Sequence, residues 1–141
     1  MGAGSTAGPS RITIVFDGGS IGNPGDGYGS YVVLGVAGSP RPARITFPGV
    51  TTNNQAEYQT LIHALNALLA ELRRQEIDPK SVGVDIYSDS QLVVEQVAGR
   101  WKVRNADLRP RVEEVRRLLG SFGDWTLRWH SRAESVRWLG H

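Results

Sequence analysis

The chain has 141 residues, of which 40% are hydrophobic and 21% are charged, as is typical of one globular domain. No apolar run approaches the roughly 18 residues that a membrane span needs, so we expect no membrane partner. The sequence contains no cysteine, which excludes disulfides, zinc–thiolate sites and thiol nucleophiles and is compatible with a cytoplasmic location.

Positive charge is unevenly distributed, although the net charge is only +2. The basic residues are 14 Arg and two Lys, and few of them lie in the first third of the chain. Arginine suits bidentate contacts with phosphate, whereas a GC-rich genome would produce the same bias without any function. Composition alone therefore leaves a nucleic-acid partner open.

The N-terminal stretch Met1–Ser10 is rich in Gly, Ala and Ser and predicts a flexible leader, which leaves 11–141 as one domain. Three β-rich segments follow, joined by short turns around Pro24-Gly25 and Ser39-Pro40, which favours an antiparallel meander. The expected strands are Ile12–Phe16, Tyr28–Val36 and Arg44–Phe47.

A long helix is predicted over about Asn54–Glu76, because apolar residues recur there at spacings of three and four. Either Thr52 with Gln55 or Asn54 with Glu57 would cap its start. The apolar face of this helix consists of Tyr58, Leu61, Ile62, Leu65, Leu68, Leu69 and Leu72.

The segment Val82–Ser88 alternates apolar and polar residues and predicts a fourth strand. The long helix before it supplies the crossover that a parallel pairing with the first strand requires. Beyond it we expect helices over Gln91–Ala98 and Ala106–Leu119, a fifth strand over Trp125–Trp129, and a short helix that starts with a Ser131–Glu134 capping box and runs to Leu139. Trp125 and Trp129 share a strand face, which predicts core positions. Together these elements predict an α/β fold, a five-stranded mixed sheet with helices on both faces.

Three acids are expected to meet at one edge of this sheet. Asp17 follows the first strand, Asp89 follows the fourth, and Glu57 lies in the first turn of the long helix. Because clustered carboxylates repel each other, they stay ionised together only if cations neutralise them. Oxygen ligands without His or Cys suit Mg²⁺ or Mn²⁺, and two such ions about 4 Å apart can promote phosphodiester hydrolysis. The simpler interpretation is that each acid is a turn or helix-capping residue.

Amides and one aromatic–basic pair accompany the acids, and each also has a simpler interpretation. Asn53, Asn54 and Gln91 carry amides that bind base edges or 2′-hydroxyls in some proteins and cap helices in others. Trp101-Lys102 offers a ring and a phosphate contact, although such a pair is usually a packed ring beside a solvated amine.

Four motifs resemble those of the type 1 ribonucleases H, in the order and spacing of that family: DGGSIGNPG at 17–25, TTNNQAEY at 51–58, SDSQLVVEQVAG at 88–99 and WKVRNADL at 101–108. The resemblance covers about 12–130 and is to the compact members that lack a basic protrusion. It implies a ribonuclease H-like fold and an endoribonuclease that hydrolyses the RNA strand of RNA/DNA hybrids. Two Mg²⁺ or Mn²⁺ ions would serve as cofactors, and the products would carry 5′-phosphate and 3′-hydroxyl ends. We expect the protein to act as a monomer in the cytoplasm.

The resemblance also implies roles for individual residues. Asp17 would bridge both metal ions, and Glu57 and Asp89 would complete the set of catalytic ligands. The expected substrate contacts are Gly18, Gly19, Ser20, Asn23, Asn53, Asn54, Gln91, Trp101, Lys102 and Asn105, with Trp101 and Lys102 facing the DNA strand.

The C-terminal stretch Ser131–His141 departs from the family pattern. A fourth acid usual in the family would fall at Leu139, and an Asn that precedes it would fall at Ser135. Three groups are candidates to replace it, Glu134, the His141 imidazole and the terminal carboxylate. We expect that none of them binds metal, and that activity survives with a raised Mg²⁺ requirement and is rescued by Mn²⁺. The alternative function is a hybrid-binding module with weak or no catalytic activity.

Overall fold

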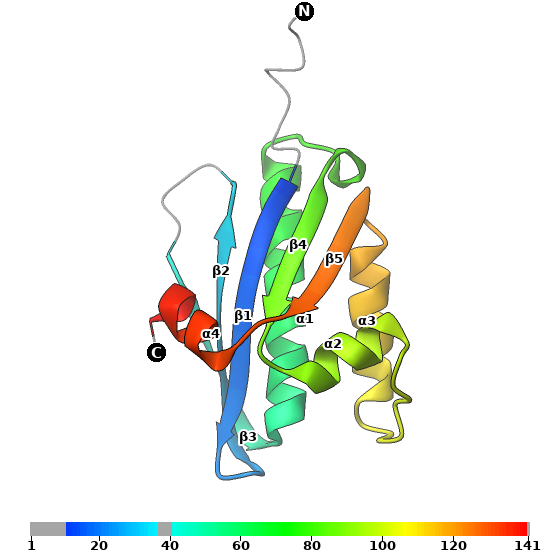
Figure 1. The fold of residues 1–141 in the computed structure, drawn as a ribbon. Coiled ribbons are helices and arrows are strands. Elements are labelled where there is room, and N and C mark those ends of the chain that lie inside the picture. Colours follow the sequence, from blue (N-terminus) through cyan, green and yellow to red (C-terminus); the bar gives the residue numbers. More distant parts are fainter. Residues whose placement is uncertain (1–10, 37–40, 141) are drawn as a thin grey trace, which may run out of the picture.

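The computed structural model describes residues 11–36 and 41–140, which form a five-stranded mixed sheet with helices on both faces (Figure 1). The strand order is β3-β2-β1-β4-β5, antiparallel from β3 to β1 and parallel from β1 to β5. The strands are β1 (Arg11–Ile21), β2 (Gly25–Leu34), β3 (Ala43–Thr51), β4 (Gly83–Ser88) and β5 (Asp124–Trp129). The predicted fold class and the parallel pairing of the first and fourth strands are confirmed.

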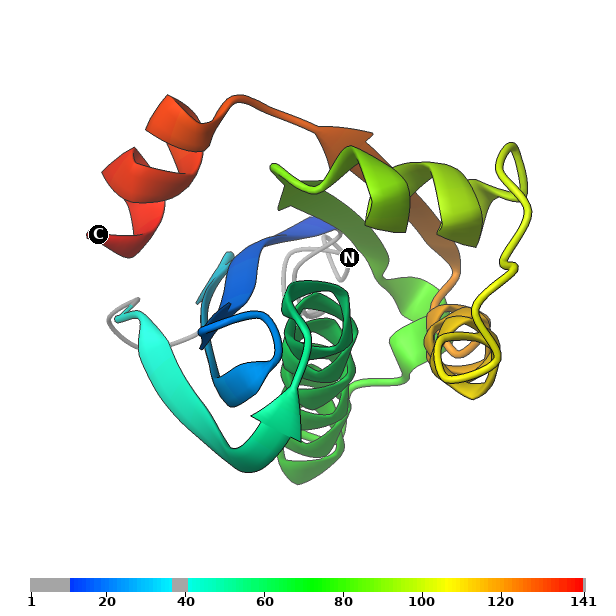
Figure 2. The same cartoon turned by 90° about the horizontal axis from the view of Figure 1, so that it is seen from below.

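The helices lie in two unequal layers. They are α1 (Asn53–Arg74), α2 (Gln91–Ala98), α3 (Arg109–Leu119) and α4 (Arg132–Leu139), with a short 3₁₀ helix, η2 (Pro79–Ser81), before β4. Figure 2 shows α1 and α3 on one side of the sheet and α4 on the other. Within the described residues, no helix is both long enough and apolar enough to cross a membrane.

Alternation along β1 sends apolar side chains to both faces of the sheet. Ile12, Ile14 and Phe16 point into the main core, where they pack against side chains of α1 and α3. Val15 points the opposite way and packs with Val32 of β2 and Leu139 of α4. Leu139 is fully buried there, so it anchors the last helix to the sheet.

The first of the two predicted caps starts α1. The backbone N–H of Gln55 donates to the Thr52 hydroxyl at 3.1 Å, and the Thr52 N–H donates to the Gln55 side-chain oxygen at 3.0 Å. This capping box satisfies two N–H groups at the helix start. It fixes where α1 begins and thereby where its next residues meet β1.

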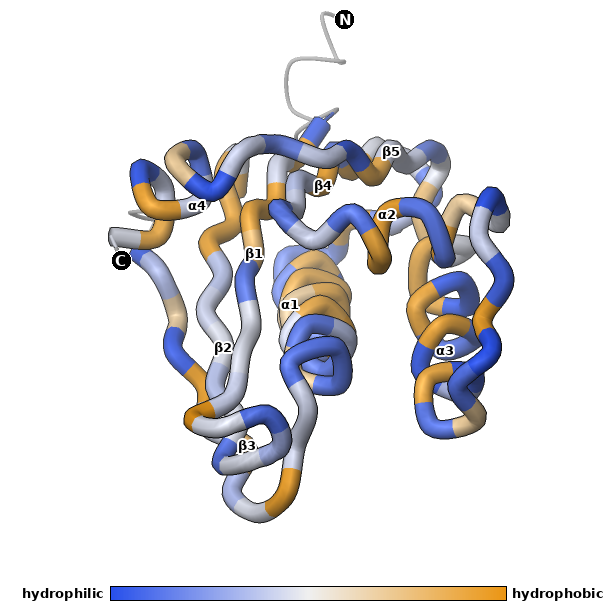
Figure 3. Tube along the Cα trace, turned by 60° about the horizontal axis from the view of Figure 1, so that its bottom comes forward, coloured by the Kyte–Doolittle hydropathy of each residue, from blue (hydrophilic) through white to orange (hydrophobic). Residues whose placement is uncertain are grey.

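β1 is longer than the sequence predicts, because it continues five residues past Phe16 to Ile21. Its parallel pairing with β4 ends at Phe16 and Ser88, but its antiparallel pairing with β2 runs on to Ile21 and Asp26. Figure 3 shows the change along the strand, in which the orange of the first half gives way to blue and then to near-white colours. Asp17 therefore lies inside β1, at the end of the parallel pairing rather than at the end of the strand.

Two further predictions need correction. α3 begins at Arg109, not at about Ala106, because Pro110 sits at the helix start and residues 106–108 form a turn before it. Trp129 is 55% exposed and is not a core residue, whereas Trp125 packs against the main core. The predicted leader and the turn at Ser39-Pro40 lie outside the described residues.

Candidate active site

Three elements bring acidic side chains to the end of β4. Asp17 of β1 lies one residue beyond the last parallel pair and opposite Ser30 of β2. Asp89 directly follows β4, as the sequence predicts. Glu57 is the fifth residue of α1, just past the first turn in which it is predicted.

Gly18 allows α1 to approach β1 closely. A Cβ at this position would lie 2.7 Å from the backbone carbonyl of Ala56 and 2.8 Å from the Glu57 nitrogen, too close for any side chain. Glycine inside a strand often marks such a close approach of another backbone. The Gly18 N–H donates to Glu57 Oε1 at 2.5 Å, so the same residue admits the helix and orients its acid.

The carboxylates of Asp17, Glu57 and Asp89 converge, and we refer to these residues as the acid trio. Each offers an oxygen within 4.8 Å of an oxygen of the others. Asp17 and Glu57 are only 3% and 6% exposed, and Asp89 is half-buried. The predicted meeting of the three acids is therefore confirmed, while their catalytic role stays a prediction.

The electrostatics of the trio favour a bound cation. Burial raises the pKa of Glu57 well above its usual range, and the nearby charges of Asp17 and Asp89 raise it further. The hydrogen bond from Gly18 and the charge of Arg132 oppose this rise without cancelling it. A divalent ion would stabilise the ionised form of the trio against this rise.

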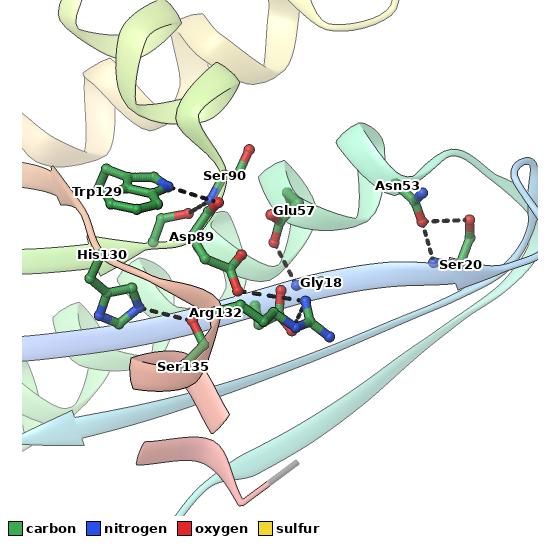
Figure 4. A network of polar contacts seen from close by, with 12 residues as sticks. Gly18, Ser20, Asn53, Glu57, Asp89, Ser90, Trp129, His130, Arg132 and Ser135 are labelled. Atoms are coloured by element: carbon green, nitrogen blue, oxygen red, sulfur yellow. Dashed lines mark hydrogen bonds and ion pairs between the residues drawn. The ribbon is translucent and has the colours of Figure 1, made fainter. Parts of the chain in front are cut away.

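Arg132 also reaches the trio, a contact that the sequence does not predict. Its Nη1 lies 3.3 Å from Asp17 Oδ2 and 3.5 Å from Asp89 Oδ2, so one nitrogen is shared between two acids (Figure 4). It is the first residue of α4, immediately after the N-cap Ser131. The sequence at this point shows a capping pattern but no signal that the arginine reaches the acids.

The donor set fits a small, hard divalent ion. All three ligating groups are carboxylates, the type that Mg²⁺ and Mn²⁺ prefer in proteins. Asp89 Oδ2 is buried and has no hydrogen-bond partner within the described residues, and it forms the 3.5 Å ion pair with Arg132. Oxygens bound to one Mg²⁺ at ~2.1 Å are at most ~4.2 Å apart, which a slight closure of the trio would satisfy.

Several predicted substrate-binding residues gather beside the trio. Asn53 Oδ1 accepts hydrogen bonds from the Ser20 backbone at 2.8 Å and from the Ser20 hydroxyl at 3.0 Å. The Asn53 N–H donates to Asn23 Oδ1 at 3.0 Å, which ties the β1–β2 turn to the start of α1. Asn54 is exposed at the start of α1, in the turn before Glu57, and Gln91 is exposed at the start of α2, just after Asp89.

Trp101, Lys102 and Asn105 lie on a separate segment between α2 and α3. All three are exposed, and Trp101 has 45% of its surface in solvent. Asn105 Oδ1 accepts a hydrogen bond from the Asp107 N–H at 2.8 Å, which shapes the turn before α3. The length of α2 separates this segment along the chain from Asp89.

The structure describes two positions that bear on a fourth metal ligand, Leu139 and Glu134. Leu139, where the family acid would fall, is buried in the apolar cluster with Val15 and Val32. The Glu134 carboxylate lies 3.9 Å from Arg137, and its backbone N–H donates to the Ser131 hydroxyl at 3.4 Å. His141 lies outside the described residues, so its role stays a prediction.

Side chains around the trio hold its supporting backbone. The Trp129 indole N–H donates to the Asp89 carbonyl at 3.1 Å, which fixes the residue after β4 and explains why this exposed ring is placed there. The His130 ring stacks on the Tyr87 ring, with 5.8 Å between the ring centroids, and its Nε2 forms a hydrogen bond of 2.8 Å with the Ser135 hydroxyl. Burial lowers the pKa of His130.

Known proteins share both the sequence pattern and the fold. The family model of RNase H matches residues 9–122. The chain is 36% identical over 127 residues to "Ribonuclease HI" of Halobacterium salinarum, covering 90% of this chain and 60% of that protein. It is 33% identical over 127 residues to "Bifunctional protein Rv2228c" of Mycobacterium tuberculosis, covering 89% of this chain and 33% of that one. The chain thus spans about 60% and one third of these two relatives.

Solved structures agree with this result. The RNase H1 of the halophilic archaeon Halobacterium salinarum superposes with a TM-score of 0.72 at 35% identity, covering 90% of each chain. LC11-RNase H1, solved in complex with an RNA/DNA hybrid, superposes with a TM-score of 0.76 at 28% identity, covering 89% of each chain.

Proposed function

Because the chain belongs to the ribonuclease H family, we propose that it hydrolyses the RNA strand of RNA/DNA hybrids in a reaction that depends on divalent metal ions. The match of the family model and the solved relative with a bound hybrid support this substrate. The products would carry 5′-phosphate and 3′-hydroxyl ends. As expected from the sequence, the protein would act as a monomer in the cytoplasm.

The single observation that carries the proposal is the acid trio. Its three oxygens lie within 4.8 Å of one another, at the carboxyl end of the parallel strands. Sites of open α/β sheets lie at such ends. A capping role for each acid would not bring three carboxylates together in a buried place, where their repulsion costs stability.

Each acid has a proposed role in holding the metal. Asp17 would contact two ions, Mg²⁺ or Mn²⁺, and Glu57 and Asp89 would complete their carboxylate ligands. Such ions activate water and stabilise the leaving oxygen of a phosphodiester. The chain keeps the ligands aimed through Gly18, which orients Glu57, and Trp129, which holds the Asp89 backbone.

Substrate contacts are proposed on both sides of the trio. The hydroxyl and amide groups of Ser20, Asn23 and Asn53 form one hydrogen-bonded group, and Asn54 and Gln91 remain exposed. Such groups suit the 2′-hydroxyls that distinguish RNA from DNA. Gly18 and Gly19 would line the same RNA-strand surface. On the segment after α2, the exposed residues Trp101, Lys102 and Asn105 would contact the DNA strand by stacking and by phosphate binding.

A second candidate function is hybrid binding with weak or no catalysis. Leu139 favours it, because a buried leucine stands where the family usually has a metal-binding acid. The retention of the trio argues against it. The two candidates make opposite predictions for turnover but the same prediction for binding.

The test is a cleavage assay on one hybrid with either strand labelled, in Mg²⁺ or Mn²⁺, with a DNA duplex as the comparison substrate. We expect cutting of the RNA strand alone. Asp17→Asn should bind the hybrid in a gel-shift assay but cut it about 10³-fold more slowly, a loss of about 4 kcal/mol of transition-state stabilisation.

Three results would change the conclusion. Efficient cutting of duplex DNA would indicate a different nuclease on the same fold. Near-normal turnover by Asp17→Asn would refute the catalytic assignment. Tight binding of the hybrid by the wild-type protein without cutting in either metal would support the binding module.

A further inference from the structure

Arg132 brings a positive charge to the trio from the opposite face of the sheet to α1. One of its nitrogens, Nη1, lies between Asp17 Oδ2 at 3.3 Å and Asp89 Oδ2 at 3.5 Å. A cation in contact with both acids occupies the place where a divalent ion would bridge the same two oxygens. The arginine and the metal therefore compete for one set of ligands.

The position of Arg132 is built into the fold rather than left to a loose terminus. The helix that carries it is capped by Ser131 at its start and anchored by the fully buried Leu139 at its end. Between them, the nearly buried Ser135 bonds His130. α4 thus holds the base of the Arg132 side chain over the acids.

The guanidinium itself is held weakly. Its contacts of 3.3 and 3.5 Å are longer than the ~2.7–2.9 Å of a charge-assisted hydrogen bond. The side chain is 65% exposed, so it can swing into solvent without leaving a cavity. A firmly bonded, buried arginine would lack this freedom.

We propose that Arg132 is the resident cation of the metal-free site, and that divalent ions bind by displacing it. This inference rests on the proposed function in taking the trio as the metal site. Three carboxylates and one arginine carry a net charge of −2, and two divalent ions added without displacement would make it +2. The leucine at position 139 supplies no fourth negative charge to offset the arginine, so repulsion expels the guanidinium as the ions enter.

The displacement has a measurable consequence, because metal affinity then includes the cost of moving Arg132. Removing its charge should tighten metal binding, whereas removing a supporting residue would loosen it. A purely structural arginine would therefore give the opposite sign of effect. The readout is metal affinity itself, which needs no substrate and no turnover.

The experiment is Mn²⁺ titration by calorimetry of the wild-type protein, Arg132→Gln and a matched control, Arg137→Gln. Arg137 lies on the same helix and pairs with Glu134 at 3.9 Å. We expect Arg132→Gln to bind Mn²⁺ about tenfold more tightly, since a unit charge has left the site. Arg132→Lys, which keeps the charge, and Arg137→Gln should stay within about twofold of wild type. Equal or weaker binding by Arg132→Gln would overturn the proposal.

Two further measurements separate this inference from the proposed function. Asp17→Asn should lose Mn²⁺ binding; if it binds normally, the trio is not the metal site and both proposals fail. If Arg132→Gln binds more tightly but no variant cuts a hybrid, the displacement stands and the proposed activity fails.

An NMR experiment tests the displacement in the wild-type protein without any variant. The Arg132 Nε–H resonance should shift when Mg²⁺ is added, while that of Arg137 stays fixed. An unmoved Arg132 resonance at saturating Mg²⁺ would also overturn the proposal.

Discussion

The two ends of the parallel strands both carry acids, and they treat them in opposite ways. At the amino end, Arg11 donates to both oxygens of Asp85 at 2.9 and 2.7 Å and reaches Asp124 at 3.0 Å. Thr126 adds a hydrogen bond to Asp85 at 2.8 Å. At the carboxyl end, two members of the acid trio, Asp17 and Asp89, share one nitrogen of Arg132 at the longer distances of 3.3 and 3.5 Å.

The difference shows in the proton affinity of the acids. Arg11 lowers the pKa of Asp85 to about 2, whereas burial and neighbouring carboxylates raise the pKa of Glu57 well above its usual range. At the amino end, Arg11 serves both Asp85 and Asp124 through short contacts, so this group of charges serves the fold. At the carboxyl end, three acids crowd together beside one arginine with longer contacts, and strongly perturbed pKa values of this kind cluster at functional sites.

The largest expected effect on stability comes from placing a fourth acid near the trio, at the carboxyl end of the parallel strands. Leu139→Asp would place a carboxylate in the apolar cluster with Val15 and Val32. We expect it to lower the free energy of unfolding by about 3 kcal/mol or more, measured by urea denaturation without metal. Leu139→Met, which keeps volume and polarity, should cost less than about 1.5 kcal/mol. A stable Leu139→Asp protein with tightened Mn²⁺ binding would instead show that the carboxyl end of the parallel strands accepts four acids.

A smaller effect is expected when the matched acid is neutralised. Asp85→Asn should lower the free energy of unfolding at pH 7 by at most about 1 kcal/mol, because Arg11 is 45% exposed and water screens the pair. The folded pKa of Asp85, about 2, lies below its ordinary 3.8, so the stabilisation is full above pH 3.8 and is lost as the pH falls toward 2. The gap between wild type and Asp85→Asn should therefore close in that window.

Asp17→Asn is the control for that measurement at the other end. It removes repulsion within the trio, so the metal-free protein should be no less stable than wild type at pH 7. Hybrid cleavage should survive Asp85→Asn and fail in Asp17→Asn. If Asp85→Asn and Asp17→Asn lower the free energy of unfolding equally, the acids at the two ends of the parallel strands do not differ in the way described.

The smallest effect is expected for Glu134→Ala. Its carboxylate faces Arg137 at 3.9 Å, and exposed pairs of this kind contribute less than about 0.5 kcal/mol. Cleavage at saturating Mn²⁺ and the Mg²⁺ titration curve should both match wild type. If activity is lost at every metal concentration while the melting temperature is unchanged, Glu134 is a ligand and the site has a fourth acid after all.

Local pattern was enough to predict that the trio meets, because helix periodicity and strand alternation imply a crossover and hence a parallel pair. The length of β1 was not predictable in this way. Its second half is Gly- and Ser-rich, with low strand propensity, and it is held extended by pairing with β2. Arg132 was missed for a related reason: its position depends on where α4 docks, which Leu139 decides through contacts far apart in the sequence.

The two-sided pairing of β1 also bears on which changes of length the protein tolerates. Asp17 is paired with Ser30 of β2, and the residue before it, Phe16, is paired with β4, so ladders on both sides of β1 set its position. Residues added to the turn at 22–24 would lengthen a hairpin and leave the acid where it is. One residue deleted from 12–16 would instead turn every later side chain of the strand to the other face, carrying Asp17 away from Asp89. The position of Asp17 therefore tolerates added length at this turn, while the spacing within the central strand has to be kept residue by residue.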